Sequence, residues 1–274
     1  MIGRHGVIRQ PLARMAGVSR ASLYYHPKMP ERDWTLKQQI EVTLRENPAY
    51  GHKRLAIHLK VNKKRILRVM HLYGLAPYRR RGKKWHKAKE KLVRYPNLLL
   101  TTTPMHPHHV WVADFTYLNW KGRVVYVGTV MDVYTRRIVG VSVLTTHATV
   151  LVVQALWNAL LFHPKPDIFH SDNGSEYNAA TFRNLLTDLG ILISRSAPGC
   201  PWENGYQESF YGKFKLDLGD PNRFGTLAEL VLAVYRTIHA YNTTRIHTAL
   251  RMAPNEFAKI ATRAIMKTTF DSLS

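Results

Sequence analysis

Three apolar runs rich in β-branched and aromatic side chains occupy residues 110–146. They read VWVADFTYLNW, RVVYVGTVMDVYT and RRIVGVSVLTT, with turn-forming residues at Lys121-Gly122 and Thr135-Arg136. Short connections between runs of this kind are typical of β-hairpins. The pattern therefore predicts three strands of an antiparallel meander.

Helical and strand patterns alternate after the meander. We expect a helix over roughly 147–162, a strand over 167–171, a helix from about Asn178, a strand over 191–197 and another helix after Pro201. A meander followed by such alternation predicts an α/β fold, in which a mixed five-stranded sheet is flanked by helices.

The last predicted helix, residues 226–242, has the clearest start. Thr226 and Glu229 have the spacing of a capping box, which satisfies free backbone N–H groups at a helix N-terminus. Its predicted buried face consists of Leu227, Leu230, Val231, Val234 and Ile238.

The first hundred residues show helical periodicity instead. Residues 11–27, PLARMAGVSRASLYYHP, read as two short helices about a tight turn. This is typical of a helix-turn-helix, although other helical hairpins share the pattern. A second helical module, residues 31–77, is predicted to contain a helix from Asp33 to about Glu46. A hairpin follows, and Asn62 can cap its second helix.

Charge is concentrated in this helical half of the chain. The protein of 274 residues has a formal net charge of +22 and a pI of about 10.2. Residues 1–100 hold 24 Lys and Arg against 5 Asp and Glu, whereas residues 101–274 hold 16 against 13. A polyanion such as DNA is the expected partner. A basic disordered tail is the alternative, which the regular recurrence of apolar residues disfavours.

Two basic stretches are candidate nucleic-acid contacts. Cations in the N-terminal half of a helix interact unfavourably with its dipole. The cations of residues 63–68 are therefore expected to bind a ligand. The alternative is that they form a solvated helix face without a ligand. Residues 78–108 read as a basic linker that can track phosphates. The candidate contacts are Lys63, Lys64, Arg65, Arg68, Arg79, Arg80, Arg81, Lys83 and Lys84.

Several classes of site are disfavoured. Cys200 is the single cysteine, so neither an intramolecular disulfide nor a multi-cysteine zinc site can form. His106, His108 and His109 have no Cys or acid at ligand spacing beside them, which disfavours a metal site there. The sequence has no signal-peptide pattern and no apolar stretch of about 18 residues, so we expect a cytoplasmic location and no membrane insertion.

Three acids are candidates for a common site. Asp114 lies within the first apolar run, where a charge is costly if buried without a partner; a lone strand Asp facing water is the alternative. Asp172 follows the fourth predicted strand in HSDNGSEY, where Asn173 and Gly174 indicate a turn. Glu208 lies on the helix after APGCPWENGYQES. If the strand before Asp172 pairs beside the first strand, the three carboxylates can converge.

Converging carboxylates predict a particular chemistry. Two divalent cations about 4 Å apart activate an attacking oxygen and stabilise a leaving one in phosphoryl transfer. Hard oxygen ligands favour Mg²⁺, which Mn²⁺ can replace, over zinc. In the absence of metal, mutual repulsion should raise the pKa of at least one of the acids.

The motifs WVADFTYL, HSDNGSEY and PGCPWENGYQESFYGKFK resemble the three acidic motifs of DDE transposases and retroviral integrases. The 35 residues between Asp172 and Glu208 match the spacing of that superfamily, and Lys215 matches the basic residue found after the glutamate. The chain is most similar to the downstream-frame (OrfB) transposases of IS-three insertion sequences. Their tail signature is matched by Tyr241, Asn242, Arg245, His247, Leu250, Pro254 and Phe257.

The resemblance implies a ribonuclease-H-like core over residues 109–260, with a tail over 261–274 and a helix-turn-helix segment over 1–30. It implies two-metal cleavage at insertion-sequence ends and transfer of the released 3′-hydroxyl to target DNA, with Asp114, Asp172 and Glu208 as catalytic metal ligands. It also implies Lys215 near the DNA phosphates, a homo-oligomer on DNA, the product of an upstream frame as a further partner, and a bacterial, nucleoid-associated location.

Some assignments stay open. We interpret Asp132 and Asp167 as structural and Glu203 as a helix-start acid. Asn173 and His170 either shape the Asp172 loop or contact DNA. The family usually has alanine at position 205, where glycine can loosen the helix start that aims Glu208.

Two other functions remain on the sequence alone. The chain could be a catalytically inactive, transposase-derived DNA-binding protein, which the intact set of three acids disfavours. It could also be a nuclease of the same fold that cuts without strand transfer. The first residues to be placed in space are therefore the three acids.

Overall fold

A computed structural model describes residues 15, 17, 29–78, 95–197 and 200–271 of the chain. Two sequence predictions lie almost wholly or entirely outside these residues. They are the helix-turn-helix over 11–27 and the basic linker positions Arg79, Arg80, Arg81, Lys83 and Lys84.

The predicted mixed sheet is confirmed. Its strands are β1 (Val110–Trp120), β2 (Arg123–Asp132), β3 (Ile138–Leu144), β4 (Ile168–Ser171) and β5 (Leu192–Arg195), in the order β3-β2-β1-β4-β5. The pairs β1–β2 and β2–β3 are antiparallel, whereas β1–β4 and β4–β5 are parallel. This strand order, with a meander followed by two parallel strands, is the ribonuclease-H-like arrangement.

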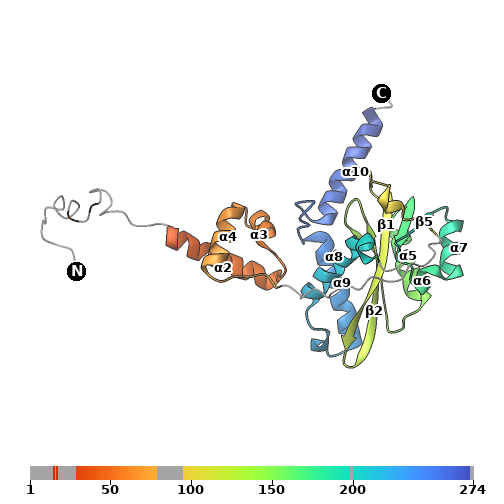
Figure 1. The fold of residues 1–274 in the computed structure, drawn as a ribbon, viewed down its shortest axis with the longest axis horizontal. Helices are drawn as coiled ribbons and strands as arrows, with labels where there is room; N and C mark the ends of the chain where they lie inside the picture. The colour runs from red at the N-terminus through yellow and green to blue at the C-terminus, as the bar shows by residue number, and fades with distance from the viewer. Residues whose placement is uncertain (1–14, 16, 18–28, 79–94, 198–199, 272–274) are drawn as a thin grey trace.

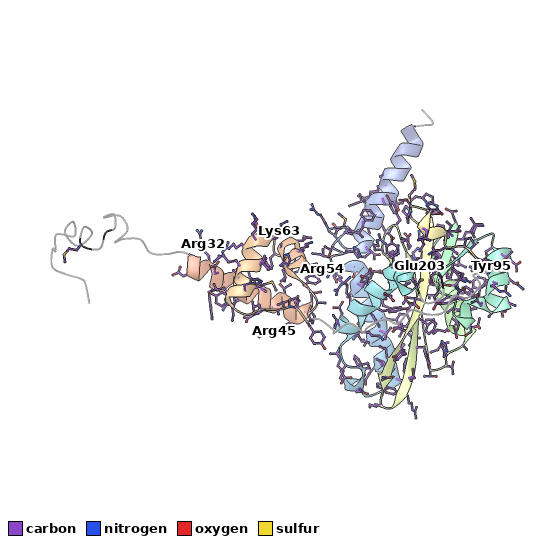
Figure 2. The ribbon with its side chains drawn as sticks, viewed as in Figure 1. Arg32, Arg45, Arg54, Lys63, Tyr95 and Glu203 are labelled. Atoms are coloured by element: carbon purple, nitrogen blue, oxygen red, sulfur yellow. The ribbon has the colours of Figure 1, made fainter. Side chains whose placement is uncertain are left out.

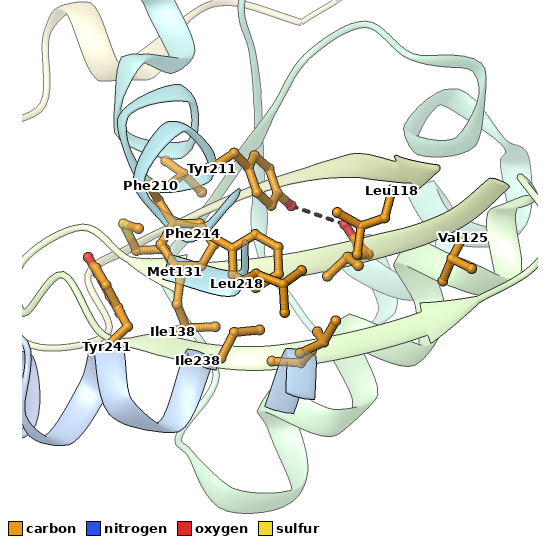
Figure 3. Close-up of a cluster of buried hydrophobic side chains, with 14 of the residues drawn as sticks. Leu118, Val125, Met131, Ile138, Phe210, Tyr211, Phe214, Leu218, Ile238 and Tyr241 are labelled. Carbon is orange, nitrogen blue, oxygen red and sulfur yellow. Dashed lines mark hydrogen bonds between the residues drawn. The ribbon is translucent and has the colours of Figure 1, made fainter. Parts of the chain in front are cut away.

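Side chains of β1 alternate between two hydrophobic cores, as expected for a strand that is covered on both faces. Val110, Val112 and Leu118 pack in one cluster with α8 (Gly205–Leu218) and α9 (Leu227–Thr243). Trp111 and Ala113 pack in the other, with α5 (Thr149–Phe162) and α7 (Ala180–Asp188). Figure 1 shows the two helix layers on either side of the sheet, and Figure 3 shows part of the first cluster.

The shorter elements connect these layers. The 3₁₀ helices are η2 (Leu98–Leu100), η3 (Pro201–Asn204) and η4 (Pro221–Arg223), and α6 (Ser175–Asn178) precedes α7. The predicted cap of α9 is present, since Thr226 Oγ accepts a hydrogen bond from Glu229 N and Glu229 reaches back to Gly225 N. The last helix, α10 (Pro254–Asp271), runs across residue 260, where the sequence places the start of a tail.

A small helical module precedes the α/β core. It contains α2 (Met29–Glu46), α3 (His52–His58) and α4 (Lys63–Leu72), which share their own apolar cluster. Asn62 caps α4 as predicted, because its side chain accepts from Lys64 N. The predicted start of the first helix at Asp33 is wrong. That residue lies in the second turn of α2, where it is buried and accepts a 2.7 Å hydrogen bond from Arg68.

Two hydrogen bonds tie this module to the α/β core. Ile246 N donates to the Tyr50 hydroxyl at 2.9 Å, and Arg54 Nε donates to Ile246 O at 2.9 Å. Figure 2 shows Arg54 on the side of the module nearest the core. Within the described ranges, no helix is both long and apolar enough to span a membrane.

Candidate active site

Asp114 lies in the middle of β1, opposite Thr129 of β2. Its Oδ1 accepts a 2.8 Å hydrogen bond from Phe115 N. Burial raises the pKa of Asp114, the charges of Asp172 and Glu208 add to the increase, and the hydrogen bond from Phe115 N opposes it; the resulting pKa is about 7. Both of the other candidate acids therefore act on this carboxyl group.

Asp172 lies beside Asp114 because β4 pairs with β1 in parallel. Val112 of β1 pairs with His170 of β4. Asp114 lies two residues after Val112 and Asp172 lies two residues after His170, so the two acids occupy matching positions. Asp172 Oδ1 accepts from Gly174 N at 3.0 Å, which closes the turn predicted from Asn173-Gly174. Burial raises the pKa of Asp172, and Glu176 raises it further.

Glu208 lies in the first turn of α8 and is exposed. Burial raises its pKa. Within the described part of the chain, no three His, Cys, Asp or Glu side chains are close enough together to form a metal site. The structure thus places Asp114 and Asp172 side by side, with Glu208 at the rim.

Two buried polar side chains hold α8 against the sheet. Gln207 Nε2 donates to Val112 O at 2.7 Å, and the Tyr211 hydroxyl donates to Asp114 O at 2.7 Å. Thr129 Oγ donates to Gln207 Oε1 at 3.0 Å, so the same strand pair receives both side chains. Figure 3 shows the Tyr211 hydroxyl pointing from α8 to the strands.

Sequence reasoning did not assign a role to Gln207 or Tyr211. The signal was available, because Gln207 shares a helical face with Phe210, Tyr211 and Phe214, all of which are buried. A glutamine in an apolar stripe must find hydrogen-bond partners when it is buried. Since Gln207 directly precedes Glu208, its bonds also orient the helix turn that carries the acid.

The donor set fits a hard divalent cation. Asp114 and Asp172 are carboxylates on adjacent strands, and their charges raise each other's energy when no cation lies between them. Oxygen ligands of this kind suit Mg²⁺ or Mn²⁺. Arg195 is fully buried at the end of β5, and its charge lowers the pKa of Asp172 against the larger effect of burial. The guanidinium of Arg195 donates to the backbone oxygens of Ser194 and Tyr177.

The other acids near the site have partners of their own. Glu176 is buried and contacts His147 Nε2 at 3.1 Å and Ser175 Oγ at 2.9 Å. Asp132 accepts from Thr135 Oγ at 2.6 Å and so holds the β2–β3 turn.

Glu203 and Asp167 also have local contacts. Glu203 accepts from Asn97 Nδ2 at 2.8 Å and from Ala197 N at 2.6 Å. Asp167 is exposed, and its carboxylate lies 3.7 Å from His106 Nε2. Glu203 also lies in the first turn of η3, in agreement with its interpretation as a helix-start acid, and the contact of Asp167 agrees with a structural role.

The residues around the Asp172 turn are held in place. Asn173 Nδ2 donates to Ser196 O at 2.6 Å, which joins the loops after β4 and β5. His170 is fully buried, and its Nδ1 lies 2.8 Å from Ser194 Oγ. Burial lowers the pKa of His170 to about 4. His170 is therefore enclosed within the sheet directly before the Asp172 turn.

The predicted DNA contacts outside the acids are of two kinds. Lys63 and Lys64 are exposed at the start of α4, whereas Arg65 and Arg68 both approach Asp33. Lys215 lies on α8, two turns beyond Glu208, with its ammonium 4.9 Å from the centre of the Tyr117 ring.

The strand order and the paired acids define a polynucleotidyl-transferase type of core. Two integrase core domain families match the chain, one over residues 104–201 and the other over residues 189–254. The chain belongs to the integrase-core (DDE) transposases of insertion sequences.

Similarity to curated relatives over about four fifths of the chain shows this membership. The chain is 32% identical over 236 residues to the transposase for insertion sequence element IS904 of Lactococcus lactis subsp. lactis (strain IL1403), covering 82% of this chain and 93% of that protein. It is 30% identical over 234 residues to the transposase for insertion sequence element IS629 of Shigella sonnei, covering 82% and 78%.

Solved structures give a more distant match. The HTLV-2 integrase catalytic core domain in complex with magnesium is 18% identical, with a TM-score of 0.45, and the match covers 57% of this chain and 99% of that chain. The strand order and the two matching domain families show the fold of the core.

Proposed function

We propose that Asp114, Asp172 and Glu208 together hold two Mg²⁺ ions and that the protein cuts DNA at the ends of its insertion sequence and joins the released 3′-hydroxyl to target DNA. The observation that carries this proposal is the parallel register of β1 and β4, which puts Asp114 beside Asp172. Bound at these carboxylates, the ions would supply activation of the attacking oxygen and stabilisation of the leaving oxygen.

The residues of the chain have separate tasks in this reaction. Asp114 and Asp172 form the rigid part of the site because each lies on or directly after a strand. Glu208 completes it when its exposed side chain turns towards Asp114. Gln207 and Tyr211 act as positioning residues, since their hydrogen bonds to β1 hold the turn of α8 that carries Glu208.

Two successive displacements complete the reaction. In the first, water attacks a phosphodiester, a P–O bond breaks and a 3′-hydroxyl is released. In the second, that 3′-oxygen attacks a phosphodiester of target DNA, and the displaced 3′-oxygen of the target leaves. We assign Lys215, on α8, and Asn173, in the loop after β4, to contacts with the DNA near the acids.

The helical module and the basic linker supply affinity for the DNA. Lys63 and Lys64 are exposed, so they can meet phosphates directly. Arg65 and Arg68 can contribute as well, although each must share its charge with Asp33. We include the linker positions Arg79, Arg80, Arg81, Lys83 and Lys84 in this set. A homo-oligomer on paired DNA ends, with the product of an upstream frame, completes the proposed assembly.

A labelled DNA fragment carrying one end of the element tests this function. With Mg²⁺, wild-type protein should give a shortened strand and a joined product, and Asp172→Asn should lower both rates roughly 100-fold or more. Asp167→Asn is the matched control. Asp167 is exposed and directly precedes β4, whereas Asp172 directly follows that strand. Binding of both variants is measured in EDTA.

The two other functions give different results in the same assay. Equal inactivity of wild type and Asp172→Asn, with binding intact, would indicate a DNA-binding protein without catalysis. Cleavage by the wild type without any joined product would indicate a nuclease of the same fold.

A further inference from the structure

A second candidate site lies between the helical module, α8 and the end of α9. It is a cavity of about 440 Å³. Five basic side chains line it: Arg54, Arg136, Lys213, Arg245 and His247. Glu203 also lines it, but that carboxylate already accepts hydrogen bonds from Asn97 and Ala197. The cavity is therefore strongly basic.

The cavity and the acidic site lie on different faces of α8. Tyr206, Ser209 and Lys213 line the cavity and are spaced at three and four residues, which puts them on one helix face. Glu208 does not line it, and Tyr211 points to β1 instead. One helix thus separates two sites of opposite charge.

Buried cationic groups in this wall have unused donors. Arg245 is only 3% exposed, and its Nε and Nη2 have no hydrogen-bond partner among the described residues. Its Nη1 pairs with Asp217. Arg136 Nη1 is likewise buried without a partner in this part of the chain, and so is Nδ1 of the neutral His247 imidazole. Leaving such donors unpaired is costly, so an acceptor ligand would stabilise them.

The neighbouring charges also indicate a missing anion. The pKa of Lys213 is lowered to about 8, first by burial and then by Arg54 and Arg245. The pKa of His247 is lowered to about 4 by burial and by four surrounding cations. Within the described residues, Asp217 is the one acid that opposes these effects on Lys213.

We propose that this cavity binds a phosphate group of the DNA backbone, held by Arg245, Lys213 and Arg136. A DNA source, as opposed to free phosphate, rests on the proposed function. It is supported by Tyr206, which is 37% exposed and whose ring centre lies 4.2 Å from the Arg136 guanidinium carbon. An aromatic ring beside a cation suits a nucleotide.

Its position gives the site a role in guiding the strand. Tyr206 and Ser209 line the cavity and lie within two residues of Glu208, so a strand anchored here contacts the same turn of α8 that carries Glu208 on its other face. Arg54 comes from the helical module, and its Nε bond to Ile246 O already joins the module to this wall. Phosphate binding here thus links the module to the α/β core.

Salt-dependent DNA binding tests the proposal. A labelled duplex carrying an element end is titrated with full-length protein by fluorescence anisotropy, in EDTA, over a range of salt concentrations. Loss of one phosphate contact should weaken binding at low salt. It should also make the negative slope of log K against log salt shallower by about one. We expect this for Lys213→Gln and for Arg136→Gln.

Lys165→Gln is the matched control, because Lys165 is exposed and donates only to Leu189 O in the contacts described. It should keep the wild-type slope. Thermal melting of each variant verifies folding, and Lys213→Gln should fold normally because it removes a cation from among like charges. Wild-type slopes and affinities for both Lys213→Gln and Arg136→Gln would overturn the proposal.

A second measurement distinguishes the source of the phosphate. If inorganic phosphate, at constant ionic strength, raises the melting temperature of the wild type but not of Lys213→Gln, while the DNA slopes stay equal, the DNA assignment is overturned. Reduced slopes in the two variants, combined with a wild type that neither cuts nor joins DNA, would support this site and contradict the proposed function. Normal cutting and joining with unchanged slopes would contradict this site alone.

Discussion

The hydroxyl of Tyr211 donates a 2.7 Å hydrogen bond to the backbone oxygen of Asp114. This bond joins α8, the helix that carries Glu208, directly to Asp114 on β1. Thr129 Oγ lies 2.8 Å from the same hydroxyl, so the bond is part of a buried network. The geometry of the acidic site therefore depends on residues that need not touch DNA.

Replacing Tyr211 with phenylalanine should reduce catalysis more than DNA binding. The change leaves the ring in the apolar cluster but removes the donor to Asp114 O, at a cost of about 1–2 kcal/mol in stability. With α8 less firmly held, we expect cleavage to slow by roughly tenfold. Single-turnover cleavage and binding in EDTA measure the two effects.

Tyr235→Phe is the matched control for this change. Tyr235 lies on α9 and is 43% exposed, so loss of its hydroxyl should alter neither rate nor stability appreciably. A cleavage rate for Tyr211→Phe equal to that of the control would show that the bond to Asp114 does not position α8.

Replacing Gly205 with alanine should stabilise the protein slightly. A Cβ at Gly205 meets nothing within 4 Å, and its φ is not positive. Alanine restricts the unfolded chain, so we expect a gain of about 0.5 kcal/mol, or roughly 1–2 °C in melting temperature. Thermal melting followed by circular dichroism measures this.

Gly140→Ala is the contrasting variant. A Cβ at Gly140 of β3 would lie 2.1 Å from Ala155 O of α5. Two non-bonded atoms cannot approach this closely, so the backbone would have to shift. This variant should melt well below the wild type. Equal melting temperatures for Gly140→Ala and Gly205→Ala would contradict the close approach of α5 to β3.

Acid should destabilise the protein partly through His163. Burial, Arg137 and His108 lower its folded pKa to about 4, from an ordinary value of 6.5. Between these pH values the unfolded chain binds more protons than the folded one, so this contribution is present above pH 6.5 and is lost as pH falls towards 4. Denaturant unfolding at pH 7 and pH 5 should therefore show a smaller loss for His163→Gln than for the wild type. Equal losses would contradict a neutral, half-buried His163.

Mg²⁺ should raise the melting temperature more at pH 8 than at pH 6. The folded pKa of Asp114 is raised to about 7 from 3.8, so in metal-free protein the favourable protonated form is lost as pH rises through about 7. A cation binds the charged form and offsets that loss. A gain of about 1 kcal/mol corresponds to roughly 2–4 °C.

Asp114→Asn should remove the difference between the two pH values. Differential scanning fluorimetry with Mg²⁺, and with NaCl at equal ionic strength as the control, measures the effect. The same gain at pH 6 and pH 8 in wild-type protein would show that Asp114 does not compete with protons for the ion.

Several strands, turns and helix caps were predictable from the sequence because each is caused by neighbouring residues. The meander, the turn at Asn173 and the caps at Asn62 and Thr226 each follow from a few neighbouring residues, and the structure has all of them. The proximity of Asp114 and Asp172 required one further step, the parallel pairing of β1 with β4.

Other features depend on packing between distant segments. The sequence could not show that Asp33 would be buried against α4 and pair with Arg68, which moves the helix start to Met29. The basic cavity also has no sequence signature, because Arg54 and Arg245 come together only when the helical module packs against the end of α9. The sequence alone therefore does not distinguish a buried cation such as Arg245 from an exposed one such as Lys63.

Counting Mn²⁺ ions bound to the protein on an element-end DNA, by electron paramagnetic resonance, tests the shared site of the three carboxylates most directly. Our account predicts two ions per active site in the wild type and a loss of bound ions in Asp114→Asn, Asp172→Asn and Glu208→Gln, with DNA binding retained. Undiminished Mn²⁺ in any one of these variants would contradict a site built from all three acids.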